Sequence, residues 1–380
     1  VACAGGGAGE EAPMSRLVGM GLLSFLLSAC QALPAGPAGR GAQPPAAAAP
    51  TTVAEPAATA PAGPLQVVRV GGVGTASEAT YYWAQERGYL REEGLELEFE
   101  IFSGAQQMIP PLGTGQLDVG SGAPGPGLFN AILRGVNVRI VADRARAAPG
   151  TSTYCLVVRK SLLDSGSVRS FADLRGRVLA ENVAGAITTS IIDRELQRVG
   201  LSLKDVTISV LPFPDMVTGF KNGVVDFGVL IEPFMTLGEE QGVLRCWKPI
   251  SELSPNFQIA VLLYSPVFIE QHADAARRFM VAHLRAMRDY YRAFFGDGQG
   301  RDEFLQLMAR VSAAQDVGLL ARLNPTWSDP NGTVNIDSLR DVQHWYLSRG
   351  EQISEVDFDI VIDMRFVDYA LNRLGRYPIP

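Results

Sequence analysis

The sequence predicts an α/β protein of two lobes, each a mostly parallel sheet flanked by helices. The first observation is an internal repeat. Residues 108–120 read MIPPLGTGQLDVG and residues 216–228 read MVTGFKNGVVDFG, with Met, the central Gly, Asp and the final Gly at one constant spacing. The second observation is that strand-type and helix-type segments alternate around both copies, which favours parallel sheets covered by helices. A chance match between two helix–glycine–strand units is the alternative interpretation of the repeat.

The first half of the body opens with a β-branched run at 66–71, which is stopped by glycines and predicts a strand. Thr75-x-x-Glu78 fits a capping box at the start of a helix that runs to residue 90. Alternating apolar and acidic residues at 95–102 predict a half-exposed edge strand. The first repeat copy follows. Because Pro110 and Pro111 lack backbone donors, we expect its helix to be short or to start late.

The second half repeats this order before the chain turns helical. Its predicted elements are strands at 154–158, 177–180 and 206–211, a capped turn at 170–173 and a helix at 182–199, whereas a further strand predicted at 136–142 belongs to the first half. A strand at 257–264 then crosses back, and helices follow at 273–295, 301–311, 317–323, 336–349 and 366–374. We therefore expect lobe 1 to comprise 65–155 and 256–380, and lobe 2 to comprise 156–255. Two chain crossings between such lobes make a hinge and a closing cleft.

The first residues predict export and anchoring. Residues 1–29 contain upstream residues and, from Met14, a signal peptide with Arg16 and an apolar run at 17–28 that is too short to span a bilayer. The run ends in Leu-Ser-Ala-Cys, which resembles a lipobox and makes Cys30 the expected lipidation site. Residues 30–64 are rich in Ala and Pro and predict an extended tether. A buried N-terminal helix with an incidental cysteine is the alternative.

Charge and composition exclude several classes of partner. The net charge of −7 and the absence of a Lys/Arg cluster argue against nucleic acid. No Cys/His spacing predicts a metal site, no cofactor is expected, and the three histidines are expected on helix faces.

Cys155 and Cys246 could pair outside the cytoplasm, but two buried thiols are the favoured interpretation because pairing cannot be deduced from sequence.

A family resemblance rests on the segment AQERGYLREEGL at 84–95 followed by GQLDVG at 115–120. Together these resemble the nitrate/sulfonate/taurine-type substrate-binding proteins of ABC importers, and the thiamine-pyrimidine binding and synthesis proteins that share their fold. SFADLRG at 170–176, GVVD at 223–226 and Glu232-Pro233 fall where that family has matching features. The resemblance implies a two-lobed, periplasmic-binding-protein-like fold of type II. The chain departs from the family at Pro110-Pro111 and at 75–80.

Candidate ligand contacts lie mostly on loops at strand ends, where parallel sheets bind ligands. They are Thr75, Ser77, Glu78, Tyr82, Ser103, Gly104 and Ala123 in lobe 1, and Asn182, Gly185, Thr188, Phe213 and Glu232 in lobe 2. Small residues around Gly185, at a predicted helix N-terminus, favour an anion, with simple capping as the alternative. Tyr82 and Phe213 either stack on a flat ring or belong to the core. Glu78 either caps its helix or binds a ligand amine.

Arg144 and Arg146 either line the cleft mouth or lie on a solvated loop. The small residues around Gly185 together with Glu232 favour a ligand that has both an acceptor and a donor, such as a zwitterion or a heterocycle, over nitrate.

We therefore expect an extracytoplasmic, lipid-anchored monomer that captures a small solute and delivers it to an ABC import permease. The resemblance leaves the ligand open among sulfonate, nitrate, pyrimidine and other heterocycles. No catalytic residue is expected. One alternative is an enzyme of the pyrimidine-synthase-like branch, for which Glu232 or Glu78 would have to serve as the nucleophile or base. Another is a ligand-sensing module.

Overall fold

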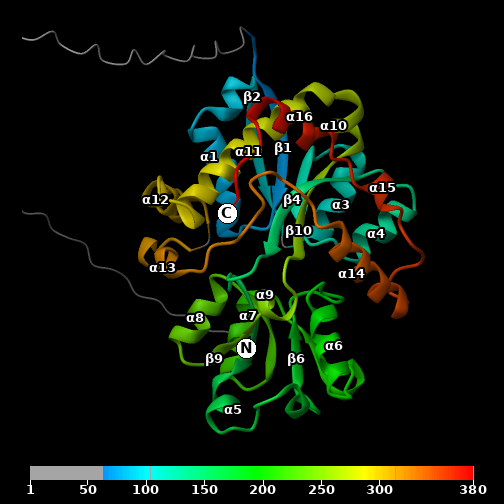
Figure 1. Cartoon of the computed structure of the whole chain (residues 1–380), viewed down its shortest axis with the longest axis vertical. Coiled ribbons are helices and arrows are strands. Elements are labelled where there is room, and N and C mark those ends of the chain that lie inside the picture. Colours follow the sequence, from blue (N-terminus) through cyan, green and yellow to red (C-terminus); the bar gives the residue numbers. More distant parts are fainter. Residues whose placement is uncertain (1–62, 103, 313, 380) are drawn as a thin grey trace, which may run out of the picture. The chain divides into compact units, whose positions relative to one another are not determined.

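The computed structural model describes residues 63–379 except 103 and 313. The signal, the tether, Cys30 and Ser103 therefore lie outside the described residues. The described part is an α/β body with two five-stranded sheets, each flanked by helices (Figure 1). This confirms the predicted fold class.

The two sheets have the same internal order and strand directions. The first runs β2-β1-β3-β10-β4, and its strands are β1 Gln66–Gly72, β2 Leu95–Ile101, β3 Val119–Gly122, β4 Arg139–Ala147 and β10 Phe257–Tyr264. The second runs β7-β6-β8-β5-β9, and its strands are β5 Tyr154–Arg159, β6 Val178–Glu181, β7 Thr207–Val210, β8 Phe227–Ile231 and β9 Leu244–Pro249. In each sheet only the fourth strand is antiparallel to its neighbours, β10 in one and β5 in the other.

Both repeat copies make the same helix–turn–strand unit, and the strands in which they end, β3 and β8, each take the third place in their sheet, as two lobes of one architecture would. Helix α3 (Ala105–Thr114) ends at Gly115 and α7 (Phe213–Lys221) is followed by Gly223, both glycines being left-handed. The shared aspartate then accepts a backbone N–H from the neighbouring parallel strand: Asp118 from Arg69 and Asp226 from Val178, each at 2.9 Å. An arginine pairs with each carboxylate at 3.0 Å or less. The repeated aspartates therefore join strands and are structural.

Helices flank both sheets, and those at 126–133, 160–164, 234–240, 250–253, 266–271 and 358–361 were not predicted. The helices are α1 Ala79–Glu86, α2 Tyr89–Glu92, α4 Pro126–Leu133, α5 Lys160–Asp164, α6 Thr189–Arg198, α8 Phe234–Glu240, α9 Ile250–Leu253, α10 Pro266–Gln271, α11 Ala273–Phe295, α12 Arg301–Val311, α13 Val317–Arg322, α14 Ile336–Ser348, α15 Phe358–Val361 and α16 Arg365–Leu374. Helix α3 begins before Pro110 and Pro111 and carries both inside it. Helix α6 begins at Thr189, not at 182, because 182–188 form a turn with Gly185 left-handed. Strand β9 was not predicted.

The longest helix organises the core behind the first sheet. Helix α11 buries an apolar face against α1, α12 and α16, and Trp83 of α1 stacks on Phe304 of α12 with ring centroids 3.6 Å apart. His283 of α11 is fully buried between Tyr81 and Phe279, and burial lowers its pKa to about 3. His283 is therefore neutral in the folded protein.

Cys155 and Cys246 form a disulfide, so the expectation of two buried thiols is wrong. The cysteines lie on β5 and β9, which are neighbours in the second sheet, and their Cα atoms are 5.7 Å apart. Pairing depends on the register between these strands, and β9 was the strand that the sequence analysis missed. The disulfide links residues 91 positions apart and closes most of the second sheet into one covalent loop.

Candidate functional site

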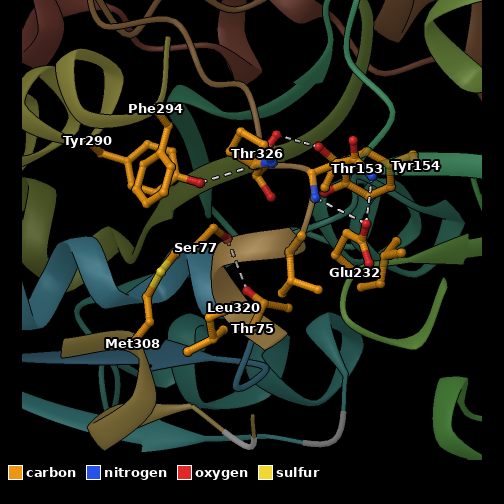
Figure 2. A pocket seen from close by; sticks show the side chains of 14 residues that line it. Thr75, Ser77, Thr153, Tyr154, Glu232, Tyr290, Phe294, Met308, Leu320 and Thr326 are labelled. Atoms are coloured by element: carbon orange, nitrogen blue, oxygen red, sulfur yellow. Dashed lines mark hydrogen bonds between the residues drawn. The ribbon is translucent and has the colours of Figure 1, made fainter. Parts of the chain in front are cut away.

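A cavity lies where strand ends of both sheets meet the C-terminal segment (Figure 2). Its lining comprises Thr75, Ser77, Thr153, Tyr154, Ile231, Glu232, Tyr290, Phe294, Met308, Leu320, Leu323, Asn324, Pro325 and Thr326. Figure 2 shows Glu232 and Tyr154 on one side of the cavity and Tyr290 and Phe294 on the other. Its volume of about 40 Å³ leaves room for water but not for a solute, so a solute needs the walls to move apart.

Glu232 is the charged group of the cavity, and its partners come from two different parts of the chain. It follows β8, and the residue is only 7 % exposed. Its carboxylate accepts from Thr236 of α8, through the backbone N–H at 3.2 Å and the hydroxyl at 3.0 Å. It also accepts from Asn324, through the backbone N–H at 3.1 Å and the side-chain amide at 2.8 Å. The Asn324 amide thus occupies a position that suits an N–H donor of a ligand.

Glu78 fixes the loop that brings Thr75 and Ser77 to the cavity. Its carboxylate accepts the backbone N–H groups of Val73, Gly74 and Thr75 at 2.6–3.0 Å, and burial raises its pKa. A Cβ at Gly72 would approach the Glu78 carboxylate to within 2.5 Å, so glycine is required there. Glu78 therefore caps the loop, which agrees with the capping alternative, and it does not line the cavity.

Arg144 lies buried behind the same loop, so neither the cleft mouth nor a solvated loop describes its position. Its guanidinium donates to the Ser77 carbonyl at 2.8 Å and to the Tyr81 hydroxyl at 3.3 Å. Its charge offsets that of the buried Glu78 carboxylate nearby. Arg146 donates to the Thr333 carbonyl and lies over the ring of Trp327. Both arginines therefore stabilise the fold through contacts with backbone carbonyls and aromatic side chains.

Two tyrosines supply neutral hydroxyl groups to the cavity. Burial raises the pKa of Tyr154 and of Tyr290, so both remain protonated at physiological pH. The Tyr290 hydroxyl accepts the Thr326 N–H at 3.1 Å, and the Thr153 hydroxyl donates to the Pro325 carbonyl at 2.5 Å. These bonds fix the strap, as we call residues 323–326, across the cavity.

The structure brings three predicted contacts together and places the others elsewhere. Thr75, Ser77 and Glu232 line the cavity, whereas Asn182, Gly185 and Thr188 lie on the turn before α6. The Gly185 carbonyl accepts the hydroxyl of Tyr346 from α14 at 2.9 Å, so the chain itself contacts that turn. Tyr82 packs on Phe99 with the rings tilted and Phe213 stacks on Phe234, in agreement with the core alternative. Gly104 caps α3, and Ala123 follows β3.

The residues that sequence reasoning missed come mainly from the C-terminal half. Tyr290, Phe294 and Asn324 reach the cavity from α11 and from the strap. From the sequence, Tyr290 and Phe294 were expected only on a helix face, and Asn324 only in a loop. No local sequence pattern shows which loop will fold over a strand end that is distant in the chain. Glu232 could be predicted from the sequence because it directly follows a buried strand, β8.

Two features are absent from the described residues. Among residues 63–379, with 103 and 313 left out, no group of His, Cys, Asp and Glu side chains could hold a metal ion. No described helix has the length and apolar character needed to cross a membrane.

Comparison with known proteins gives a family match and many structural matches. The family model described as NMT1/THI5 like matches residues 76–293, more than half of the 380-residue chain. None of the curated proteins matches the chain. A structure titled putative sulfonate ABC transporter, periplasmic sulfonate-binding protein SsuA from Methylobacillus flagellatus KT superposes with a TM-score of 0.61 and 18% identity, covering 82% of this chain and 95% of that one.

Two further structures share the fold at similar distance. The periplasmic nitrate-binding protein NrtA from Synechocystis PCC 6803 has a TM-score of 0.65 and 15% identity, covering 82% of this chain and 89% of that one. The desulfurization enzyme DSZB has a TM-score of 0.55 and 17% identity, covering 81% of this chain and 99% of that one. At such identities these likenesses establish the fold alone.

Proposed function

Because the chain belongs to the NMT1/THI5-like family, we propose that it is the substrate-binding component of an ABC importer. The family match and the fold shared with the sulfonate- and nitrate-binding proteins support this assignment. The enzyme DSZB shares the same fold, so the assignment depends on the site and not on the fold.

One observation carries the proposal: a cavity whose walls come from the strand ends of both sheets. Thr75 and Ser77 follow β1 of the first sheet, and Glu232 follows β8 of the second. We propose that residues 65–155 with 256–380, and residues 156–255, are two lobes that close on the solute at this cavity. A binding protein that presents its closed form to a permease needs such a two-sided site.

The cavity lining favours an organic solute with an N–H donor. Its charged group is the Glu232 carboxylate, and the described residues that line it include no Lys or Arg. A buried carboxylate repels a bare anion and stabilises an ammonium or ring N–H through a charge-assisted hydrogen bond. Tyr290 and Phe294 add aromatic surface opposite Glu232 (Figure 2). An amine-bearing heterocycle therefore fits better than nitrate or an aliphatic sulfonate.

The contacts of the strap indicate how the solute enters. The hydrogen bond from Asn324 to Glu232 joins the first-sheet part of the chain to the second-sheet part. The ligand N–H takes the place of the Asn324 amide on the Glu232 carboxylate, and the strap is displaced as it does so. The small volume of the cavity agrees with a strap that occupies the site in the absence of solute.

The proposal includes an anchor and a location. The Leu-Ser-Ala-Cys sequence supports lipidation at Cys30, and the Ala/Pro-rich residues 30–64 then hold the body at the outer face of the membrane, beside the permease.

Catalysis is the alternative, as in DSZB. The described lining holds no Cys or His, which leaves Glu232 as its acid–base group, so turnover of a bound compound would favour this alternative.

Thermal-shift measurement on a compound panel tests the proposal. The panel contains nitrate, taurine, an aliphatic sulfonate and amine-bearing pyrimidines, applied to the wild type and to Glu232→Gln. A compound at one hundred times its Kd stabilises the fold by about 2.7 kcal/mol. We expect amine-bearing heterocycles to raise the Tm of the wild type and to raise it less in the variant. If only nitrate or sulfonate stabilises the protein, and equally in both forms, the ligand class is wrong.

A further inference from the structure

A second, larger cavity lies away from the first, between α6 and α14. Its volume is about 500 Å³, within the range of about 300–1,000 Å³ that is typical of small-molecule sites. Figure 1 shows α6 and α14 on one side of the described body, and α8, α12 and α13 on the other. Helix α6 flanks the second sheet, α14 belongs to the C-terminal segment, and residues 254–257, where the chain crosses back between the sheets, complete the wall.

Arg194 is the cationic group of this cavity, and among the described residues it has no ion-pair partner. Its Nε is buried without a hydrogen-bond partner, and no ion pair joins it to any described residue. The adjacent acids on α6 are engaged elsewhere: Asp193 accepts the Trp345 indole N–H at 2.8 Å, and Glu195 pairs with Arg198 at 2.6 Å. A partly buried guanidinium without a counter-charge is destabilising, so an anionic group from outside the chain would stabilise it.

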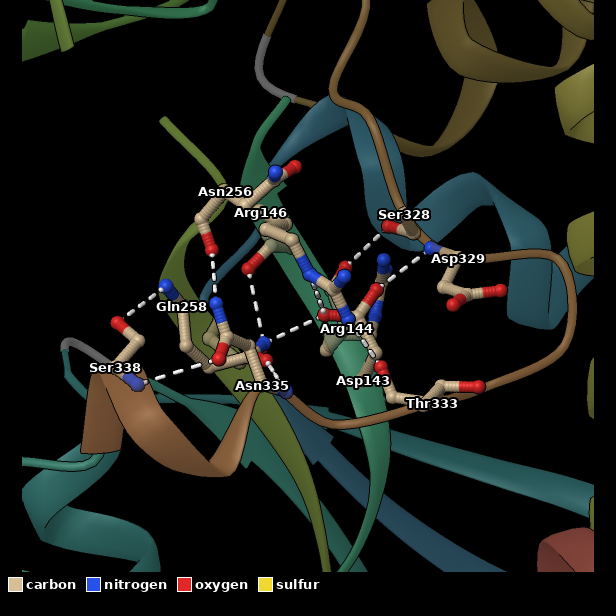
Figure 3. Close-up of polar contacts among 12 residues, drawn as sticks. Asp143, Arg144, Arg146, Asn256, Gln258, Ser328, Asp329, Thr333, Asn335 and Ser338 are labelled. Atoms are coloured by element: carbon tan, nitrogen blue, oxygen red, sulfur yellow. Dashed lines mark hydrogen bonds and ion pairs between the residues drawn. The ribbon is translucent and has the colours of Figure 1, made fainter. Parts of the chain in front are cut away.

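The wall opposite Arg194 is rigid and polar. Asn335 donates from its side chain to the Asn256 carbonyl at 2.7 Å and accepts the Ser338 N–H at 3.2 Å. The backbone N–H of Asn335 in turn donates to buried Gln258, which is bonded to Asp143 (Figure 3). Because these hydrogen bonds fix the side chains, the wall keeps its shape whether or not the cavity is occupied. Binding then costs little conformational entropy, which favours it.

The rim carries the opposite charge. Asp337 and Asp341 of α14 are both exposed residues of the lining, whereas the Nε of Arg194 is buried. Asp337 also pairs with Arg340 of the same helix at 3.1 Å. Trp345 and Phe257 contribute aromatic surface to the lining. The cavity thus presents a cation inside, carboxylates at the mouth and an apolar patch.

We propose that this cavity is a second ligand site that binds a free α-amino acid. The ligand carboxylate pairs with the Arg194 guanidinium, which suits a bidentate contact, and its ammonium lies toward Asp337 and Asp341. Its side chain lies on Trp345 and Phe257. The site is distinct from the cavity at Glu232, and it does not depend on the function proposed for that cavity.

Calorimetric titration with glycine, L-glutamine and L-leucine tests this site, with acetate and propylamine as probes that each lack one charge. We expect at least one amino acid to bind at least tenfold more tightly than either single-charge probe. Arg194→Met should weaken this binding at least tenfold, and its Tm should be unchanged or raised, because an unpaired cation is removed. Arg198→Gln is the matched control on the same helix, and its affinity should equal that of the wild type.

Three results would overturn the site. Binding that is equal in Arg194→Met and the wild type would show that the guanidinium holds no ligand, as would no amino-acid binding at 10 mM. Loss of amino-acid binding in Glu232→Gln but not in Arg194→Met would place the amino acid in the first cavity. Retained binding in Glu232→Gln is the expected result, whether or not the first cavity has the ligand class proposed for it.

Discussion

Replacing Asn324 with alanine tests how the strap closes the first cavity. The Asn324 amide donates to the buried Glu232 carboxylate at 2.8 Å, and a hydrogen bond to a charged group contributes about 1.5–3 kcal/mol. The backbone N–H of Asn324 and the Thr236 hydroxyl still reach the same oxygen, at 3.1 and 3.0 Å, so we expect the lower end of that range. Asn324→Ala should therefore lower the free energy of unfolding by about 1–2 kcal/mol in urea titrations.

Thr236→Val is the matched control, because Thr236 donates to the same carboxylate from α8, which follows β8 directly. Both variants should lose stability, but only Asn324→Ala should expand the unliganded protein in small-angle scattering. Asn324→Ala should also bind an N–H-bearing ligand more tightly, because the competing amide is absent. Equal expansion in the two variants, or expansion in neither, would refute the closing role of the strap.

Three further predictions concern charge, covalent structure and anchoring. Burial raises the pKa of Asp143 to about 6, above its usual 3.8, so ionisation of this group opposes folding. The contribution of the protonated Asp143 side chain to stability should be complete below about pH 4 and should fall by about 3 kcal/mol as the pH rises through 6, and Asp143→Asn should remove this component of the pH dependence in unfolding curves. Reduction of the Cys155–Cys246 disulfide, which spans 91 positions, should lower the free energy of unfolding by about 4 kcal/mol, and a double alanine variant should be insensitive to reductant. Cys30→Ser should release the protein from membranes in fractionation, and equal partition of variant and wild type would contradict lipidation.

The sequence predicted those parts of the fold that local patterns determine. The repeated glycine and aspartate at 115–118 and 223–226 marked equivalent units, and alternating segments predicted the two sheets. The sequence of a strand does not show which distant strand it pairs with or in what register. For this reason β9 and the disulfide were not predicted. The start of α6 was placed too early because left-handed Gly185 holds a turn there in place of a helix.

The candidate site was predicted only where a residue follows a buried strand. Glu232 and the loop at 75–77 could be found in this way, because parallel strands place such residues at one edge of a sheet. Asn324, Tyr290 and the strap reach the cavity through tertiary contacts between segments far apart in the chain. The residues next to them in the sequence give no indication of these tertiary contacts.

A crystal structure of the complex with the compound that gives the largest thermal shift tests the central claim most directly. The account predicts electron density for the ligand in the first cavity, with a ligand N–H on the Glu232 carboxylate, the Asn324 amide displaced, and contacts to the loop at 75–77. Density at the turn 182–188, or on the surface of one sheet only, would contradict a solute site between the two sheets at Glu232.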